Sequence, residues 1–383
     1  MKDQKKILVF VDWYLPGYKA GGQIRSVANM VAYMKSEFDF WIVTSDTDLH
    51  NNRPYADIVP DVWIKAPDGS NVMYLSESKR NYKTVKAVIM EARADVIYLN
   101  SLFSKVFTIY PLLVRKRHLP VRKVVLAPRG MLGKGALQIK SRKKKLFLFW
   151  ARITGLYRNI RWHASTHQEE NEIRRYFPRA ESVTVALDLS DPREIRFKER
   201  EKRPGEIRIV FLSRISPKKN LDTTLRLLSS VSKNSKVIFD IYGPVEEPEY
   251  WKQCEERIHS MPSHVSVNYK GFVKNEDVTS VLQGYHLSIL LTLNENFGHS
   301  IIESMAAGCP VLLSDQTPWR NLEAEKAGWD IPLSDEGAIL KALERMTGMR
   351  QTEFDEWSKN AFEYARKVIF NPDDIEQNRK LFR

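Results

Sequence analysis

Residues 287–310 read LSILLTLNENFGHSIIESMAAGCP and contain, in order, a short apolar run, a polar loop and a helical pattern. The run Leu287–Leu291 has the length and continuity of a strand that is buried on both faces. The helix is expected over His299–Ala306. Phe297 and Gly298 come just before it, at an N-terminus where backbone N–H groups and the helix dipole favour an anion. A strand, a loop and a helix in this order predict one half of a parallel βαβ unit.

The same alternation of short apolar runs and amphipathic stretches continues along the whole chain, which predicts an α/β fold. The predicted strands are Ile7–Asp12, Phe40–Thr44, Asp95–Leu99, Val121–Ala127 and Val183–Val185 in the first half, and Arg208–Leu212, Val237–Tyr242, Val265–Tyr269, Leu287–Leu291 and Val311–Leu313 in the second. The predicted helices are Gly22–Lys35, Val85–Arg93, Phe103–Lys116, Leu221–Val231, Pro248–His259, Asp277–Leu282, His299–Ala306 and Glu336–Met346.

The polar segment Asp188–Gly205 separates the two series and is expected to link two domains. We therefore predict two doubly wound, Rossmann-like domains at residues 1–190 and 205–365, facing each other across a cleft. The tail at residues 366–383 is expected to be helical and to pack back on the first domain.

Composition excludes several classes of protein. The chain has 383 residues, of which 43% are apolar, and its 17 Phe, 15 Tyr and 9 Trp are too many for a disordered chain. No apolar run approaches the ~20 residues of a membrane-spanning helix. The apolar run Ile7–Val11 is too short for a signal peptide and is expected to be the first strand. Two cysteines, Cys254 and Cys309, exclude a disulfide scaffold and favour a reducing cytoplasm.

The basic charge is concentrated in one stretch. The chain has 60 Lys and Arg against 47 Asp and Glu, yet residues 96–168 contain sixteen basic residues and no acidic one. Within that stretch, Lys140–Arg152 (KSRKKKLFLFWAR) places cations directly before the apolar run Leu146–Trp150. One interpretation is an interfacial helix that binds anionic lipid head groups. The other is a solvated helix whose lysine stems cover a buried apolar stripe.

The sequence also contains candidate phosphate-binding loops. Neither GxGxxG nor GxxxxGK[ST] occurs, which excludes the usual nicotinamide dehydrogenases and P-loop kinases. However, FLSRISPKK at residues 211–219 places Arg214 and Lys219 in a predicted strand-to-helix loop. Gly243 ends a further strand, and PGYKAGG at residues 16–22 leads from the first strand into a helix. Glu295 and Glu303 flank the start of the helix described above.

This ordered set of motifs resembles the retaining nucleotide-sugar glycosyltransferases of family 4, which have the GT-B fold. The resemblance covers nearly the whole chain and is best in the second half. It implies that Glu295 and Glu303 are the family's E-x7-E pair, the first contacting the transferred sugar and the second the ribose hydroxyls. It also implies that Arg214 and Lys219 neutralise the donor diphosphate. By the same resemblance, the donor is bound by Glu303, Phe297, Gly298, His299 and Gly243, and Gly21 and Gly22 lie near the diphosphate and the acceptor.

Some positions depart from the family pattern. Many relatives have a histidine beyond the fourth strand of the first domain, where this chain has Asn100, and an often histidine-containing site at Ala127–Gly130, where it has Arg129. Asn100 is a candidate acceptor contact, and Arg129 is either a phosphate contact or a structural cap of its loop. His163 and His167 are expected to be packing or capping residues.

The resemblance implies a hexosyltransferase-type enzyme that needs no metal and no cofactor, because Arg214 and Lys219 stabilise the leaving diphosphate. Asp46-Thr47-Asp48 is accordingly expected to be a polar loop. The donor is expected to be a UDP-sugar rather than a GDP-sugar, and the acceptor a glycan, expected to be carried on a polyprenyl diphosphate. This places the protein in capsule, lipopolysaccharide or other surface polysaccharide synthesis, peripheral on the inner face of the cell membrane.

Three alternatives remain at this point. A sugar-nucleotide epimerase of the same fold would usually lack the E-x7-E arrangement, and a phosphorylase would need a cofactor lysine. A nucleic-acid-binding protein that only shares the fold would explain the basic stretch, but no helix-turn-helix, zinc-finger, RRM or OB signature accompanies it, so no nucleic-acid partner is expected.

Overall fold

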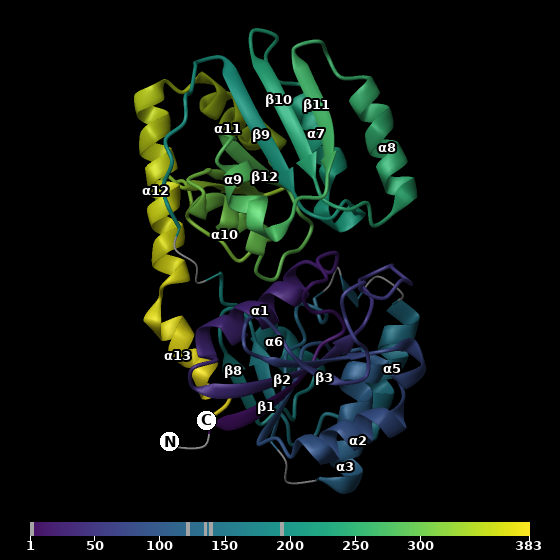
Figure 1. The fold of residues 1–383 in the computed structure, drawn as a ribbon. Helices are drawn as coiled ribbons and strands as arrows, with labels where there is room; N and C mark the ends of the chain where they lie inside the picture. Colours follow the sequence, from purple (N-terminus) through teal and green to yellow (C-terminus); the bar gives the residue numbers. More distant parts are fainter. Residues whose placement is uncertain (1–3, 120–122, 134–135, 138–140, 192–194) are drawn as a thin grey trace. The chain divides into compact units, whose positions relative to one another are not determined.

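The computed structural model describes residues 4–119, 123–133, 136–137, 141–191 and 195–383. The chain divides into two compact units (Figure 1). Unit 1 is Met1–Pro192 together with Asn371–Arg383, and unit 2 is Arg193–Phe370. The last helix, α13 (Pro372–Lys380), therefore belongs to unit 1 although it follows unit 2 in the sequence.

Unit 1 is built on an eight-stranded sheet in the order β3-β4-β2-β1-β5-β6-β7-β8. Neighbouring strands are parallel, except that β3 runs antiparallel to β4 at the edge. The strands are β1 (Lys5–Phe10), β2 (Phe38–Ser45), β3 (Trp63–Lys65), β4 (Asn71–Leu75), β5 (Val96–Leu99), β6 (Lys123–Leu126), β7 (Arg161–Ala164) and β8 (Ser182–Val185). The helices are α1 (Gly22–Met34), η1 (Glu77–Lys79), α2 (Tyr82–Ala92), η2 (Lys105–Ile109), α3 (Tyr110–His118), α5 (Ser141–Ile153), α6 (His167–Tyr176) and α13.

Helices cover both faces of this sheet because alternate residues of its strands point to opposite sides. Leu8 and Phe10 of β1 pack in the cluster that includes residues of α2, α3 and α5. Ile7 and Val9 pack in the opposite cluster with α1. The C-terminal Phe382 completes this second cluster, where its ring meets Phe38, Phe40 and Tyr98 edge-on.

Unit 2 is built on a six-stranded parallel sheet in the order β11-β10-β9-β12-β13-β14. The strands are β9 (Glu206–Leu212), β10 (Lys236–Tyr242), β11 (Val265–Gly271), β12 (Leu287–Leu290), β13 (Val311–Ser314) and β14 (Gly328–Ile331). The helices are η3 (Pro217–Lys219), α7 (Leu221–Leu228), α8 (Pro248–His259), η4 (Asn275–Asp277), α9 (Val278–Leu282), α10 (His299–Ala306), α11 (Glu336–Gly348) and α12 (Gln351–Ile369). Every strand and helix predicted from the sequence of this half is present, with bounds that shift by a few residues.

The predicted doubly wound α/β class is thus confirmed for both sheets. The structure adds β3, β4, β7 and β14, which the apolar pattern did not reveal. Among the described residues, no helix combines the length and apolar character needed to cross a bilayer.

Candidate functional site

The strand order of unit 2 singles out one place in its sheet. Numbered along the chain, its strands lie in the order 3-2-1-4-5-6, so the direction of winding reverses between neighbouring strands β9 and β12. In open α/β sheets, ligands bind beyond the carboxyl ends of the strands at this switch point. The loop after β9 carries Arg214 and Lys219, and the loop after β12 carries Glu295. The structure therefore brings these predicted residues to the position where a ligand is expected.

Hydrogen bonds to backbone carbonyls connect the two loops. The Thr292 hydroxyl and the Leu293 N–H both donate to the Lys218 carbonyl, at 2.9 and 2.8 Å. The Asn220 side-chain amide donates to the Leu291 carbonyl at 2.9 Å. Because these hydrogen bonds connect the two loops, they also hold the side chains of both loops in a defined position relative to each other.

Lys219 and Glu295 form a buried ion pair, in which the Lys219 ammonium donates to Glu295 Oε2. Only 10% and 13% of the two side chains are exposed. Burial alone would raise the pKa of the Glu295 carboxyl, but the ammonium groups of Lys219 and Lys218 outweigh it and lower that pKa to about 2. Glu295 is therefore an ionised, acceptor-only group at any physiological pH.

Arg214 lies at the more open side of the same loop. Its Nη1 donates to Glu246 Oε1 at 2.6 Å, and about a third of its side chain is exposed. The neighbouring Gly243 directly follows β10 and has φ 139°, and a Cβ there would lie 1.9 Å from the Ser213 carbonyl oxygen. Gly243 thus lets the loop after β10 pass directly over the loop that carries Arg214.

The start of α10 depends on a second glycine. Gly298 has φ 81°, in the left-handed region, and a Cβ would approach Ile301 Cδ1 at 2.6 Å. The Phe297 side chain is buried, its carbonyl accepts from Trp319 Nε1 at 2.7 Å, and its ring packs against that of His299. This arrangement fixes the direction in which the N-terminal amides of α10 point. Glu303 follows one turn later and is partly buried.

In unit 1 the glycine loop leads into α1. Gly21 is the N-cap residue of α1 with φ 59°, and Gly22 is the first residue of the helix. The Asp48 carboxylate accepts from the N–H groups of Tyr18 and Lys19 at 2.9 and 3.2 Å, so it holds this loop in place. Asp46 is buried and paired with Arg80. The Asp46-Thr47-Asp48 segment is therefore a polar loop whose two carboxylates are buried and bind other parts of unit 1.

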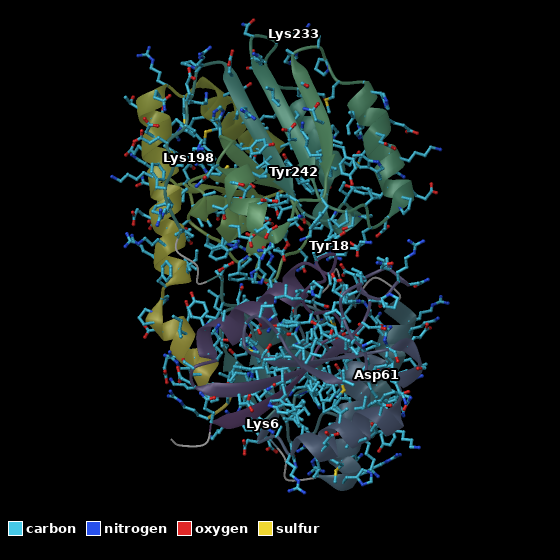
Figure 2. The ribbon with its side chains drawn as sticks, in the orientation of Figure 1. Lys6, Tyr18, Asp61, Lys198, Lys233 and Tyr242 are labelled. Atoms are coloured by element: carbon cyan, nitrogen blue, oxygen red, sulfur yellow. The ribbon has the colours of Figure 1, made fainter. Side chains whose placement is uncertain are left out.

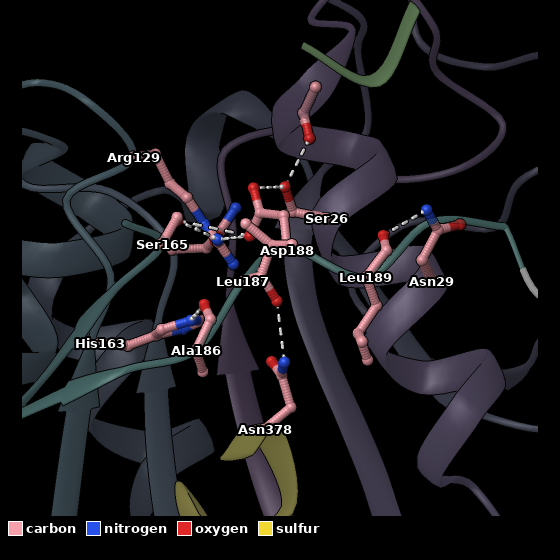
Figure 3. A network of polar contacts seen from close by, with 12 residues as sticks. Ser26, Asn29, Arg129, His163, Ser165, Ala186, Leu187, Asp188, Leu189 and Asn378 are labelled. Atoms are coloured by element: carbon pink, nitrogen blue, oxygen red, sulfur yellow. Dashed lines mark hydrogen bonds and ion pairs between the residues drawn. The ribbon is translucent and has the colours of Figure 1, made fainter. Parts of the chain in front are cut away.

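Arg129 lies in a buried polar network at the carboxyl ends of β5, β6 and β7 (Figure 3). Its guanidinium is ion-paired with Asp188, and it donates from Nε to Asn100 Oδ1 at 2.7 Å and from Nη2 to the Tyr98 hydroxyl at 2.7 Å. Asn100 is fully buried and donates from Nδ2 to the Gln23 carbonyl at 3.2 Å. These contacts favour the structural interpretation of Arg129 over the phosphate contact, and they use the polar atoms of Asn100 within the unit.

The two histidines of this region have different environments. His163 is buried, with Nδ1 at 2.8 Å from the Tyr98 hydroxyl. Its Nε2 lies 2.8 Å from the Ala186 carbonyl (Figure 3). Burial and the nearby Arg129 lower the pKa of His163 to about 4, so its ring is neutral. His167 is an exposed residue in the first turn of α6, whose N-cap is Thr166.

Asp12 is a titratable group to which the sequence interpretation gave no role. It follows β1 at the switch point of unit 1, between β1 and β5, and accepts from the Ser104 hydroxyl at 2.7 Å. Burial raises the pKa of its carboxyl to about 6 despite this hydrogen bond. The pKa of this carboxyl therefore lies close to neutral pH, as it does in side chains that act as general bases. The signal was present in the sequence, since Asp12 ends an apolar strand, but its burial was not.

Among the residues that the structure describes, no group of three or more His, Cys, Asp or Glu side chains is arranged to hold a metal ion.

Solved structures of similar fold cover almost the whole chain. The Anabaena protein HepE in complex with UDP and glucose has a TM-score of 0.69 and 15% identity, covering 99% of this chain and 98% of its own. Sucrose-phosphate synthase from Thermosynechococcus elongatus has a TM-score of 0.71 and 16% identity, with coverage of 99% and 98%. WaaG, a glycosyltransferase involved in lipopolysaccharide biosynthesis, has a TM-score of 0.66 and 13% identity, with 98% of both chains covered. At these identities the likeness establishes the fold, which is GT-B with two Rossmann-like units.

No curated protein sequence matches the chain. A family model does match, over residues 192–367, and its description is glycosyl transferases group 1. This range contains all the strands of unit 2 and the candidate residues of its switch point, from Arg214 to Glu303.

Proposed function

We propose that this protein is a retaining glycosyltransferase that moves a sugar from a nucleoside diphosphate sugar to a hydroxyl of a glycan. The observation that carries the proposal is the Lys219–Glu295 ion pair at the switch point of unit 2, next to the start of α10. A cation, an ionised carboxylate and helix N-terminal amides together are complementary to a diphosphate that is joined to a sugar.

In the proposed donor complex, Arg214 and Lys219 neutralise the diphosphate and Glu303 accepts hydrogen bonds from the two ribose hydroxyls. A UDP-sugar is favoured, and the Anabaena protein of similar fold was solved with UDP and glucose. Glu295 keeps its negative charge because its pKa is about 2. It therefore serves to accept hydrogen bonds from the sugar hydroxyls and to stabilise positive charge on the ring. It does not serve as a proton donor.

The chemistry follows from where charge develops. The leaving diphosphate gains negative charge as the glycosidic bond breaks, so cations that are already fixed in place stabilise the transition state more than the ground state. Two side-chain cations and the α10 amides supply this stabilisation, and we propose that the reaction proceeds without a divalent metal. In a front-face, retaining transfer the departing phosphate takes the proton of the acceptor hydroxyl.

We further propose that the acceptor is a lipid-linked glycan of a surface polysaccharide. The basic stretch of residues 96–168, all of it in unit 1, supports this choice because a polyprenyl-diphosphate carrier is anionic and held at a membrane. WaaG, which is similar in fold, is involved in lipopolysaccharide biosynthesis.

A thermal-shift panel of UDP, GDP, ADP and their sugars tests the donor proposal. A ligand at 100 times its Kd stabilises the native state by about 2.7 kcal/mol, so the correct nucleotide raises the Tm. We expect UDP and one UDP-sugar to give the largest shift, and transfer from that donor to continue in EDTA. A Tm that no nucleotide changes would refute the proposed donor site. Conversion of the nucleotide sugar to its epimer without any acceptor would indicate the epimerase alternative.

A further inference from the structure

Helix α5 presents large apolar side chains to solvent. Their exposed fractions are 70% for Leu146, 62% for Phe149, 45% for Trp150 and 69% for Ile153. The spacing of these residues is i, i+3, i+4 and i+7, so they form one continuous stripe along the helix. We call these four residues the outer stripe. Single exposed apolar residues are ordinary, but four neighbours on one helix face are an unusual surface for a protein in water.

The opposite side of α5 is already packed. Leu148 and Ala151 are buried in the core of unit 1, and the Phe147 ring meets that of Phe103 at 5.6 Å. Lys144 lies on this side too, where its ammonium donates to the Ala136 carbonyl at 2.5 Å and lies over the Phe103 ring. The core of unit 1 therefore uses the second apolar stripe of the helix. The outer stripe is not part of that core cluster, although the Trp150 ring lies 5.9 Å from the ring of Phe147.

Cations border the outer stripe. At about 100° per residue, Lys145 and Arg152 lie along one edge of it and Lys143 along the other, while Arg142 continues it toward the N-terminus. All four side chains are exposed. The sequence has no acidic residue between Asp95 and Glu169, so no carboxylate of this stretch neutralises them. Lys140, the first residue of the predicted interfacial segment, lies outside the described residues.

We propose that α5 docks unit 1 on an anionic lipid bilayer, with the outer stripe inserted among the acyl chains and the bordering cations on the lipid phosphates. An apolar face flanked by Lys and Arg is the pattern of a helix that lies in the plane of the interface. The negative surface potential of the bilayer attracts each basic residue, and each inserted apolar side chain is stabilised because it leaves water. Docking of α5 on a bilayer is independent of the proposed sugar transfer.

A bilayer fits this surface better than a second copy of the chain does. In a two-fold pairing of α5 helices, the same cationic borders would face each other, and like charges at close range disfavour the complex. A nucleic acid would satisfy the cations, but it would leave four large apolar side chains against a phosphate backbone. Only a surface with anionic head groups over an apolar interior is complementary to both parts.

The test measures sedimentation of the purified full-length protein with phosphatidylcholine vesicles, with and without phosphatidylglycerol. We expect binding that requires phosphatidylglycerol. Substituting Leu146→Gln, Phe149→Gln and Ile153→Gln together should weaken it on the order of 100-fold. Substituting Lys143→Gln and Lys145→Gln should weaken it roughly 30-fold, and the matched pair Lys143→Arg and Lys145→Arg should leave it unchanged.

A site-specific probe keeps the test independent of folding defects. Both native cysteines, Cys254 and Cys309, are buried, so an environment-sensitive dye attached to Ile153→Cys reports on α5 alone. We expect a blue shift on anionic vesicles that the same dye at Lys233→Cys in unit 2 does not show (Figure 2). Absence of both sedimentation and the blue shift would overturn the proposal, as would a dimer in light scattering that the outer-stripe substitutions dissolve. Nucleotide binding is measured without vesicles, so its failure is distinct from a failure of docking.

Discussion

Replacing Lys219 by methionine leaves the Glu295 carboxylate buried without its main partner, and the cost can be worked out from the structure. The pKa of Glu295 is lowered from 4.5 to about 2 in the folded protein, which corresponds to about 3 kcal/mol of stability above pH 4.5. Breaking a buried ion pair by removing one partner typically costs about 3–5 kcal/mol. The pKa shift and the typical cost of a broken buried ion pair therefore give similar losses of stability. For a unit of this size such a loss corresponds to a fall in Tm on the order of 10 °C.

The pH dependence identifies the cause. Because the folded pKa of Glu295 lies below its unfolded value, the pair stabilises the protein fully above pH 4.5, and this contribution is lost as pH falls toward 2. Thermal unfolding followed by circular dichroism should show a large stability gap between wild type and Lys219→Met at pH 7 and a smaller one at pH 3. Adding Glu295→Gln to Lys219→Met should recover part of the loss, and the exposed control Lys359→Met should change nothing. A gap below about 1 kcal/mol at pH 7, or a gap that is the same at both pH values, would show that the Lys219–Glu295 pair does not stabilise the folded protein in this way.

Three further predictions concern single residues. Arg129→Gln should destabilise the protein by about 3 kcal/mol, because the buried Asp188 carboxylate loses the guanidinium that it pairs with, and should leave the Kd for the nucleotide unchanged; a weaker Kd in calorimetry would restore the phosphate role. Asp12→Asn should raise the Tm at pH 8 and not at pH 3.5, because a raised carboxyl pKa makes wild type lose stability as pH rises from about 4 to 6; an equal change at both pH values would contradict the burial of this charge. Gly243→Ala should cost at least about 3 kcal/mol in urea unfolding, because its Cβ would overlap the Ser213 carbonyl; wild-type stability would show that this loop is not fixed.

The fold could be predicted wherever strands are long and apolar. The strands β1, β9 and β10 contain the consecutive apolar residues Ile7–Phe10, Ile209–Leu212 and Val237–Phe239, and such runs are visible in the sequence. β7 and β14 were missed because each has four residues and includes polar ones, such as His163 and Asp330. Such strands become regular because their neighbours are already in place, which is information that lies outside the segment itself.

The contacts within the candidate site could not be predicted from the sequence. Lys219 and Glu295 are 76 residues apart, and only the pairing of β9 with β12 brings their loops together. Asp188, the partner of Arg129, was assigned to the interdomain linker, where a buried ion pair is not expected. In α5, likewise, the sequence does not show which apolar residues the core of unit 1 covers and which form the exposed outer stripe.

We propose that unit 2 binds a nucleoside diphosphate at its switch point, with Glu303 on the ribose. The most direct measurement is isothermal titration of UDP into wild type, Glu303→Gln and the exposed control Glu344→Gln on α11. We expect Glu303→Gln to bind UDP about 10–100-fold more weakly, because two charge-assisted hydrogen bonds are lost, and the control to bind like wild type. Equal Kd values for all three proteins, or no binding to any of them, would contradict the proposal.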